Sequence, residues 1–192
     1  MTLTCATALT LSRIALTFLL LATLRHEGLF FRALSFSLFL GASLTDYYDG
    51  RLARAKNQVT NFGVFLDPIA DKILVIASLI AFVELGLIPA WMVVLVLSRE
   101  LVITGIRLLA FSQGRGVLVP GLGGKHKTAT QMGGILWVLG VLVMREVATP
   151  VETFLEESVT WVMGVVVWVT VSSGLLYLWR RRLLFKKGGP FH

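Results

Sequence analysis

The chain has 192 residues, of which 56% are hydrophobic and only 15% are charged, and this balance excludes an ordinary soluble globular domain. The single cysteine, Cys5, excludes a disulfide framework, a cysteine-rich zinc site and a cysteine-ligated cluster, because each needs at least two thiols. A formal net charge of +7 in so apolar a chain favours anionic lipid head groups or an anionic substrate over nucleic acid.

Apolar runs near the length that crosses a bilayer follow one another along the whole chain. They predict six transmembrane helices, over residues 4–24, 33–49, 68–85, 89–111, 128–144 and 155–179. The first run differs from a secretory signal, because no basic residue precedes it and Arg13 interrupts its apolar core. No repeat, low-complexity tract or long linker divides the runs. The sequence therefore predicts an all-α integral membrane protein whose residues 1–192 form one domain.

The distribution of basic residues predicts the orientation of these helices in the membrane. Most of the 18 lysines and arginines follow the second run, separate the fourth from the fifth, or follow the sixth. The opposite side holds only Arg25, Arg32 and Arg145. We therefore expect a multi-pass protein of the cell (inner) membrane, with both termini and the three basic segments in the cytoplasm. Lys72 and Arg99 fall within or beside predicted spans and require partners.

All aspartates of the chain lie in the window 46–71, which covers the end of the second span and the start of the third. Asp46 and Asp49 are three residues apart, and Asp67 and Asp71 are four apart, so each pair shares one face of a helix. If the two helix ends pack together, four carboxylates meet at the inner membrane surface, where divalent cations relieve their repulsion. Oxygen ligands select Mg²⁺ or Mn²⁺, and four carboxylates suit a two-ion site that grips phosphate.

The residues between the two aspartate pairs fit a phosphate ligand. Gly50 and Gly63 allow a ligand to approach the backbone closely, and Arg54 neutralises phosphate charge. Asp67-Pro68 has the pattern of an N-cap followed by a proline at the first helical position, so we expect the third helix to begin there. The alternative is that the aspartates form interfacial salt bridges with neighbouring basic residues or only cap helices.

The stretch 46–71 fits the pattern D-x2-D-G-x2-A-R-x8-G-x3-D-x3-D and resembles the CDP-alcohol phosphotransferase family. The resemblance implies that family's fold, a six-helix membrane enzyme that is commonly a homodimer and displaces CMP from a CDP-linked lipid with an alcohol. It implies two metal ions, Mg²⁺ or Mn²⁺, held by Asp46, Asp49, Asp67 and Asp71. Asp71 would also be the general base. The implied CDP-binding residues are Asp49, Gly50, Ala53, Arg54 and Gly63.

A second stretch is similar to one subgroup of that family. Ser98-Arg99-Glu100, Arg107 and Gly124-Lys125-His126-Lys127-Thr128 resemble the corresponding segments of bacterial phosphatidylglycerophosphate synthases. The implied substrates are CDP-diacylglycerol and sn-glycerol 3-phosphate. Cations suited to the acceptor's phosphate are Arg99, Arg107, Lys125 and Lys127. Alternatively these charges only set the topology, or Arg99 pairs locally with Glu100.

Other interpretations and partners follow from the remaining residues. The same chemistry could use inositol phosphate, serine or phosphatidylglycerol as the acceptor. A divalent-cation transporter is the alternative from a different class, although the basic residues have no evident use in a cation path. We expect the basic run at 180–187 to contact anionic lipids. We expect the glutamates between the fifth and sixth spans to be solvated; these are Glu146, Glu152, Glu156 and Glu157.

Overall fold

A computed structural model describes the backbone of residues 5–56, 61–112, 123–147 and 152–186, and the side chains of residues 11–45, 72–106, 127–147 and 154–179. Within those ranges the chain forms six helices and no strand, which confirms the predicted all-helical class. The helices are α1 (Cys5–Leu24), α2 (Leu29–Lys56), α3 (Asn61–Glu84), α4 (Ala90–Ser112), α5 (Gly123–Arg145) and α6 (Glu152–Lys186).

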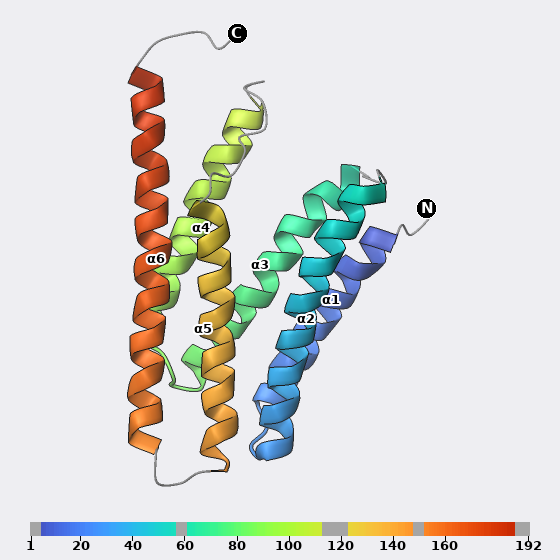
Figure 1. Ribbon diagram of the computed structural model, residues 1–192, viewed down its shortest axis with the longest axis vertical. Helices are drawn as coiled ribbons and strands as arrows, with labels where there is room; N and C mark the ends of the chain where they lie inside the picture. The colour runs from blue at the N-terminus through green and yellow to red at the C-terminus, as the bar shows by residue number, and fades with distance from the viewer. Residues whose placement is uncertain (1–4, 57–60, 113–122, 148–151, 187–192) are drawn as a thin grey trace.

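Successive helices run in opposite directions along the bundle, as Figure 1 shows. The start of α1, the end of α2, the end of α4 and the end of α6 therefore point towards the same end, which is the upper end in that view. We call this the basic end, because the segments predicted to carry most of the lysines and arginines lie there. The opposite end, with the α1–α2 and α3–α4 turns, is called the outer end.

The bundle core forms where the apolar faces of the helices meet. α1 packs against α2 and α3, α5 packs against α2 and α6, and α4 packs against α6, while α3 makes smaller contacts with α4 and α5. Large apolar side chains from five of these helices are at most 1% exposed: Leu20, Phe39, Phe82, Val138 and Met163. Their burial joins these five helices in one packed core.

The molecular surface is unusually apolar for the described part of the chain. Trp161 is 76% exposed and Leu101 is 72% exposed, whereas Ser35, Ser78 and Thr170 are fully buried. Water favours the opposite distribution, so an apolar exterior over a partly polar interior is typical of helices that face hydrocarbon. Among the described residues, two stretches are long and apolar enough to cross a membrane, Lys127–Arg145 and Phe154–Trp179.

The predicted boundaries around the aspartates are wrong. α3 begins at Asn61, so Asp67-Pro68 lies inside the helix and does not start it. α2 continues to Lys56, which places Gly50 and Arg54 in helix. The hydropathy pattern ends at the first charged residues, whereas residues 51–56 are mostly strong helix formers and extend the helical backbone. Pro68 costs one amide donor within α3, and the long helix tolerates that loss.

A glycine turn ends α3 at the outer end of the bundle. Gly86 has a φ of 71°, and the amides of Gly86 and Leu87 donate to the carbonyls of Val83 and Phe82 at 3.0 and 2.9 Å. This pattern is a Schellman C-cap, which ends α3 at the left-handed position that glycine occupies without strain.

Glu146 and Glu156 are exposed, as the sequence predicted, but both also bind other parts of the chain. Glu146 accepts a hydrogen bond from the Gly28 amide at 3.3 Å and lies 3.8 Å from Nε of the buried Arg32. Glu156 pairs with Arg145 at 2.9 Å. These acids therefore connect α5 to the α1–α2 turn and to α6.

Candidate functional site

The aspartate window lies on the two helices that meet at the basic end. α2 ends at Lys56 and α3 begins at Asn61, so the four residues between them keep the two helix ends within about 18 Å of each other. Figure 1 shows both ends in the same part of the bundle. The window therefore covers the last turns of α2 and the first turns of α3.

Helical spacing orders the predicted ligands along these two helices. Positions 46, 49, 50 and 53 share one face of α2, and positions 63, 67 and 71 share one stripe of α3. The side chains of this window lie outside the described residues. Metal binding and CDP binding therefore stay predictions for Asp46, Asp49, Gly50, Ala53, Arg54, Gly63, Asp67 and Asp71.

A charged cluster of described side chains begins at the residue that follows Asp71. Its centre is Glu100 of α4, whose side chain is 13% exposed. Glu100 Oε1 accepts hydrogen bonds from Arg99 Nη1 at 3.2 Å and from Lys127 Nζ, and Glu100 Oε2 lies 3.9 Å from Lys72 Nζ. We call Glu100, Lys72, Arg99 and Lys127 the Glu100 cluster. It joins α3, α4 and α5.

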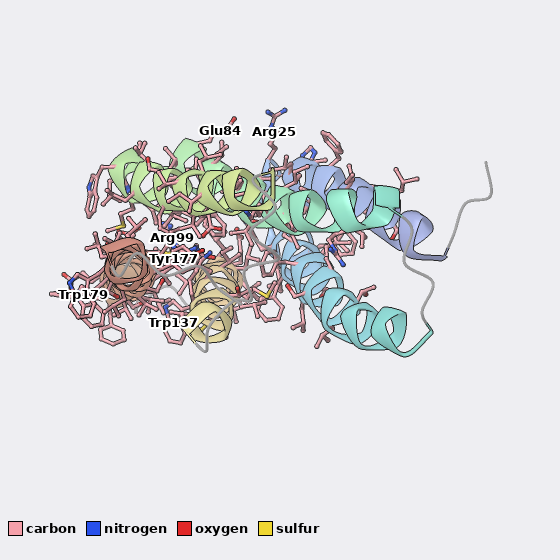
Figure 2. All side chains as sticks on the ribbon, turned by 90° about the horizontal axis from the view of Figure 1, so that it is seen from above. Arg25, Glu84, Arg99, Trp137, Tyr177 and Trp179 are labelled. Atoms are coloured by element: carbon pink, nitrogen blue, oxygen red, sulfur yellow. The ribbon has the colours of Figure 1, made fainter. Side chains whose placement is uncertain are left out.

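Neighbouring polar groups hold the two outer cations of the cluster in place. Lys72 Nζ donates to Thr104 Oγ1 of α4, and Arg99 Nη2 donates to Ser173 Oγ of α6 at 3.2 Å. Ser173 Oγ donates in turn to the Thr170 carbonyl at 2.9 Å. Figure 2 shows Arg99 directed into the space between α4, α5 and α6 and not towards the surface. The cluster is therefore connected to all four helices from α3 to α6.

Arg99 reaches Ser173 by passing over a glycine. A Cβ atom at Gly174 would lie 2.8 Å from Arg99 Cγ, which is closer than real Cβ atoms approach, and 3.2 Å from Arg99 Nε. A side chain at this position fits only if the arginine or the helix backbone shifts. Gly174 therefore allows α6 to approach α4 closely enough for the Arg99–Ser173 hydrogen bond.

The cluster rests on a second polar contact between α5 and α6. One helical turn beyond Lys127, the buried Gln131 donates from Nε2 to Thr170 Oγ1 at 3.4 Å. Thr170 is fully buried, so this pair continues the polar interior below the cluster. Gathering charges in such a place costs desolvation energy, which the close pairing of opposite charges and the added hydrogen bonds offset.

The structure answers part of the prediction for the acceptor phosphate. It brings Arg99 and Lys127 together on one carboxylate, although they come from different helices. The local pair between Arg99 and Glu100 is present, but Lys127 shares the same oxygen, so the pair belongs to a contact between helices. Arg107 lies in α4 and Lys125 in the first turn of α5, and their side chains are outside the described residues.

Sequence reasoning did not count Lys72 or Glu100 as site residues. Their position in the sequence could have identified them. An ionisable residue within an apolar span is energetically unfavourable, so it usually marks a functional region. Lys72 also directly follows the predicted base Asp71 on α3. The Glu100 cluster and the aspartate window therefore share that helix.

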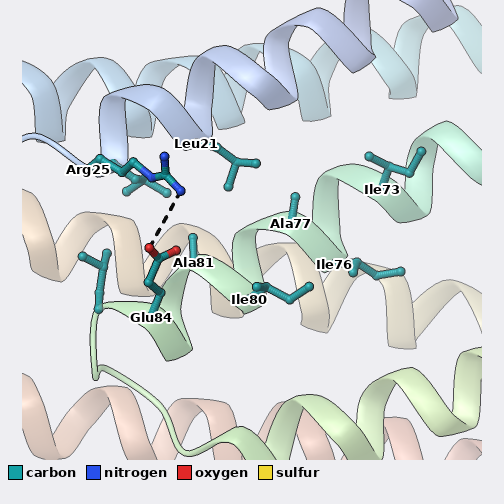
Figure 3. A pocket seen from close by; sticks show the side chains of 10 residues that line it. Leu21, Arg25, Ile73, Ile76, Ala77, Ile80, Ala81 and Glu84 are labelled. Atoms are coloured by element: carbon teal, nitrogen blue, oxygen red, sulfur yellow. Dashed lines mark ion pairs between the residues drawn. The ribbon is translucent and has the colours of Figure 1, made fainter.

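A cavity between described residues lies away from these charges. It is a groove of about 580 Å³ between α1 and α3, lined mainly by Leu21, Leu24, Ile73, Ile76, Ala77 and Ile80. Figure 3 shows the Arg25–Glu84 ion pair, 3.8 Å long, across its outer end. Both partners are largely exposed, so the pair is weak. The groove is mainly apolar, and the arginine that lines it, Arg25, lies at the outer end beside Glu84.

Comparison with known proteins gives a consistent picture. A family model described as CDP-alcohol phosphatidyltransferase matches residues 3–180. The chain is 44% identical over 140 residues to the "CDP-diacylglycerol--glycerol-3-phosphate 3-phosphatidyltransferase" of Bacillus subtilis, which covers 73% of this chain and 69% of that protein. It is 38% identical over 149 residues to the "Probable phosphatidylglycerophosphate synthase" of Mycobacterium tuberculosis, covering 78% and 66%.

A plant relative of different name is also similar. The chain is 33% identical over 195 residues to the "Cardiolipin synthase (CMP-forming)" of Oryza sativa, covering 93% of this chain and 58% of that protein. The matched part of the chain thus spans about two thirds of the two bacterial relatives and less of the plant one.

Proposed function

The chain belongs to the CDP-alcohol phosphatidyltransferase family, and from this membership we propose that it is a CDP-diacylglycerol–glycerol-3-phosphate 3-phosphatidyltransferase. It transfers the phosphatidyl group of CDP-diacylglycerol to sn-glycerol 3-phosphate and releases phosphatidylglycerophosphate and CMP. The observation that carries the proposal is the 44% and 38% identity to two bacterial relatives that are named for this reaction.

We propose that all six helices cross the cell membrane as parts of one domain, residues 1–192, with the basic end in the cytoplasm. The apolar exterior of the described helices and the position of the basic segments at one end support this orientation. CDP-diacylglycerol then keeps its acyl chains in the bilayer while its head group reaches the aspartate window. The terminal basic run at 180–187 contacts anionic lipids.

The aspartate window suits two Mg²⁺ or Mn²⁺ ions. Its ligand set is four carboxylates on two neighbouring helix ends, with hard oxygen donors only. Such ions, when bound, neutralise the pyrophosphate and make its lipid-bearing phosphorus more electrophilic. Asp46, Asp49, Asp67 and Asp71 hold the ions. CDP is bound by Asp49, Gly50, Ala53, Arg54 and Gly63.

The chain's own groups then complete the transfer. The Asp71 carboxylate accepts the proton of the acceptor hydroxyl, and the freed oxygen attacks the phosphorus that carries diacylglycerol. A bond forms between that oxygen and phosphorus, and the bond between phosphorus and the bridging oxygen of CMP breaks. CMP leaves with the electron pair of the broken bond. Arg99, Arg107, Lys125 and Lys127 bind the phosphate of the acceptor and hold its hydroxyl near Asp71.

An acceptor panel tests this function. Purified protein in lipid nanodiscs with CDP-diacylglycerol and Mg²⁺ should release CMP with sn-glycerol 3-phosphate, and much more slowly with inositol phosphate, serine or phosphatidylglycerol. Turnover with phosphatidylglycerol but not with glycerol 3-phosphate would favour the cardiolipin-forming alternative that the rice relative suggests. Turnover with inositol phosphate or serine alone would also overturn the proposal.

We further propose that the enzyme is a homodimer, as the resemblance implies. The exposed apolar surface of the described helices gives a second copy a face on which to pack. Light scattering of the protein in detergent should give twice the mass of one chain. A monomer mass at enzymatically active concentrations would contradict this.

A further inference from the structure

We propose that Glu100 is a positioning residue of the acceptor site, a role that rests on the proposed function. It holds Lys72, Arg99 and Lys127 in the one arrangement from which the phosphate of glycerol 3-phosphate is bound. Glu100 does not touch the acceptor itself. Its carboxylate acts through the cations that surround it.

The geometry of the contacts supports this role. Both carboxylate oxygens of Glu100 are used: Oε1 by Arg99 and Lys127, and Oε2 by Lys72 at 3.9 Å. These cations come from α4, α5 and α3, and those helices touch one another less than α5 touches α6 or α1 touches α2. A single side chain therefore fixes charged groups whose helices are otherwise joined by few contacts.

Charge repulsion explains why the cations need such a centre. Lys72, Arg99 and Lys127 carry like charges that all lie within 4 Å of the same carboxylate. Lysine side chains have four flexible carbons, so without the carboxylate their ammonium groups can swing towards the aqueous end of the bundle. Arg99 is less free, because Ser173 and Gly174 hold it against α6.

Two opposing effects make the proposal easy to test. A carboxylate beside a phosphate site weakens phosphate binding by charge alone, so a purely electrostatic role predicts tighter acceptor binding when Glu100 is neutralised. A positioning role predicts weaker binding, because a site must be preorganised to hold its ligand. The sign of the change in acceptor affinity therefore separates the two roles.

The experiment is Glu100→Gln in the full chain in nanodiscs, with KM measured for each substrate separately. We expect the KM for glycerol 3-phosphate to rise about tenfold or more, while the KM for CDP-diacylglycerol changes less than about twofold. Glu100→Asp, which restores the charge on a shorter side chain, should recover part of the affinity. Glu84→Gln is the matched control, because Glu84 pairs with Arg25 on the exposed outer groove, and it should change neither KM.

A double-mutant cycle tests whether Glu100 acts through its cations. If it does, Glu100→Gln should add little to the rise in acceptor KM that Lys127→Met already causes, because both substitutions disrupt the same interaction. Fully additive effects, a lower KM for glycerol 3-phosphate, equal rises for both substrates or no change would each overturn the proposal.

Failure of the proposed function is recognised separately. If the wild-type protein turns over only another acceptor, the proposed function is wrong, and the role of Glu100 is tested on the KM of that acceptor. Carbodiimide cross-linking gives a readout without turnover, because it activates the Glu100 carboxylate and Lys127 Nζ then forms an amide with it. Mass spectrometry should find this cross-link in the wild-type protein. Its absence would overturn the contact on which the inference rests.

Discussion

Lys127 on α5 donates a hydrogen bond to Glu100 on α4, 27 residues earlier in the chain. Both side chains are largely buried, at 9% and 13% exposed, so this ion pair belongs to the interior of the bundle. It places a cation that was predicted to bind the acceptor phosphate in the same cluster as Arg99 and Lys72. The first predictions follow from this contact.

Lys127→Ala should weaken acceptor binding more than donor binding. We expect the KM for glycerol 3-phosphate to rise about tenfold with little change for CDP-diacylglycerol, since the lost ammonium serves only one substrate. Glu100 keeps Arg99 and Lys72, so the loss of stability should stay at about 1–3 kcal/mol. Substrate-dependent rates and thermal unfolding in detergent measure both effects. Equal KM changes for the two substrates would indicate general damage to the site.

Gly174→Ala should displace Arg99 from Ser173. The new methyl group would lie 2.8 Å from Arg99 Cγ, so either the arginine moves or α6 does, at a cost of about 1–3 kcal/mol. The acceptor KM should rise together with the loss of stability. Gly164→Ala, on the same helix with nothing within 4 Å, is the control and should be neutral or slightly stabilising. Identical behaviour of the two variants would argue against close packing at Gly174.

Asp71→Asn should abolish the transfer while the CDP-lipid still binds. Removal of a general base lowers turnover by about 10²–10⁴-fold, and the amide keeps the size of the side chain. Single-turnover CMP release measures the rate, and binding of a radiolabelled CDP-lipid measures affinity. Turnover within about tenfold of the wild type would remove Asp71 from the role of base.

Chelation should stop the reaction reversibly. Treatment with EDTA followed by gel filtration should leave folded protein without activity, and Mg²⁺ or Mn²⁺ should restore it, because the predicted ligands are hard oxygens. Helical circular dichroism before and after treatment separates loss of metal from loss of fold. Full synthesis in thoroughly chelated buffer would contradict the two-ion site.

The number and order of the helices in the described part of the chain could be predicted from the sequence, because long apolar runs are a strong signal. The helix ends predicted near the aspartates were wrong, because hydropathy marks the apolar stretch that suits lipid, whereas α2 and α3 extend beyond that stretch. Glu146 is exposed, as expected, but its bond to the Gly28 amide could not be predicted, since it joins positions 118 residues apart.

The same limit applies to the candidate site. Residue type and resemblance singled out Arg99 and Lys127, but their meeting on Glu100 depends on how α4 packs against α5 and α6. Local patterns carry no information about such contacts. The metal ligands and CDP-binding residues of the aspartate window stay predictions.

The adjacency of Asp71 and Lys72 has a consequence for how the two substrates influence each other. Consecutive helical positions are about 100° apart around the axis. One helix, α3, therefore carries both the predicted proton acceptor, Asp71, and a cation of the Glu100 cluster, Lys72. A substrate that fixes the position of α3 when it binds also fixes it for the other substrate. Donor and acceptor should therefore bind with positive thermodynamic linkage, even though they occupy separate sites.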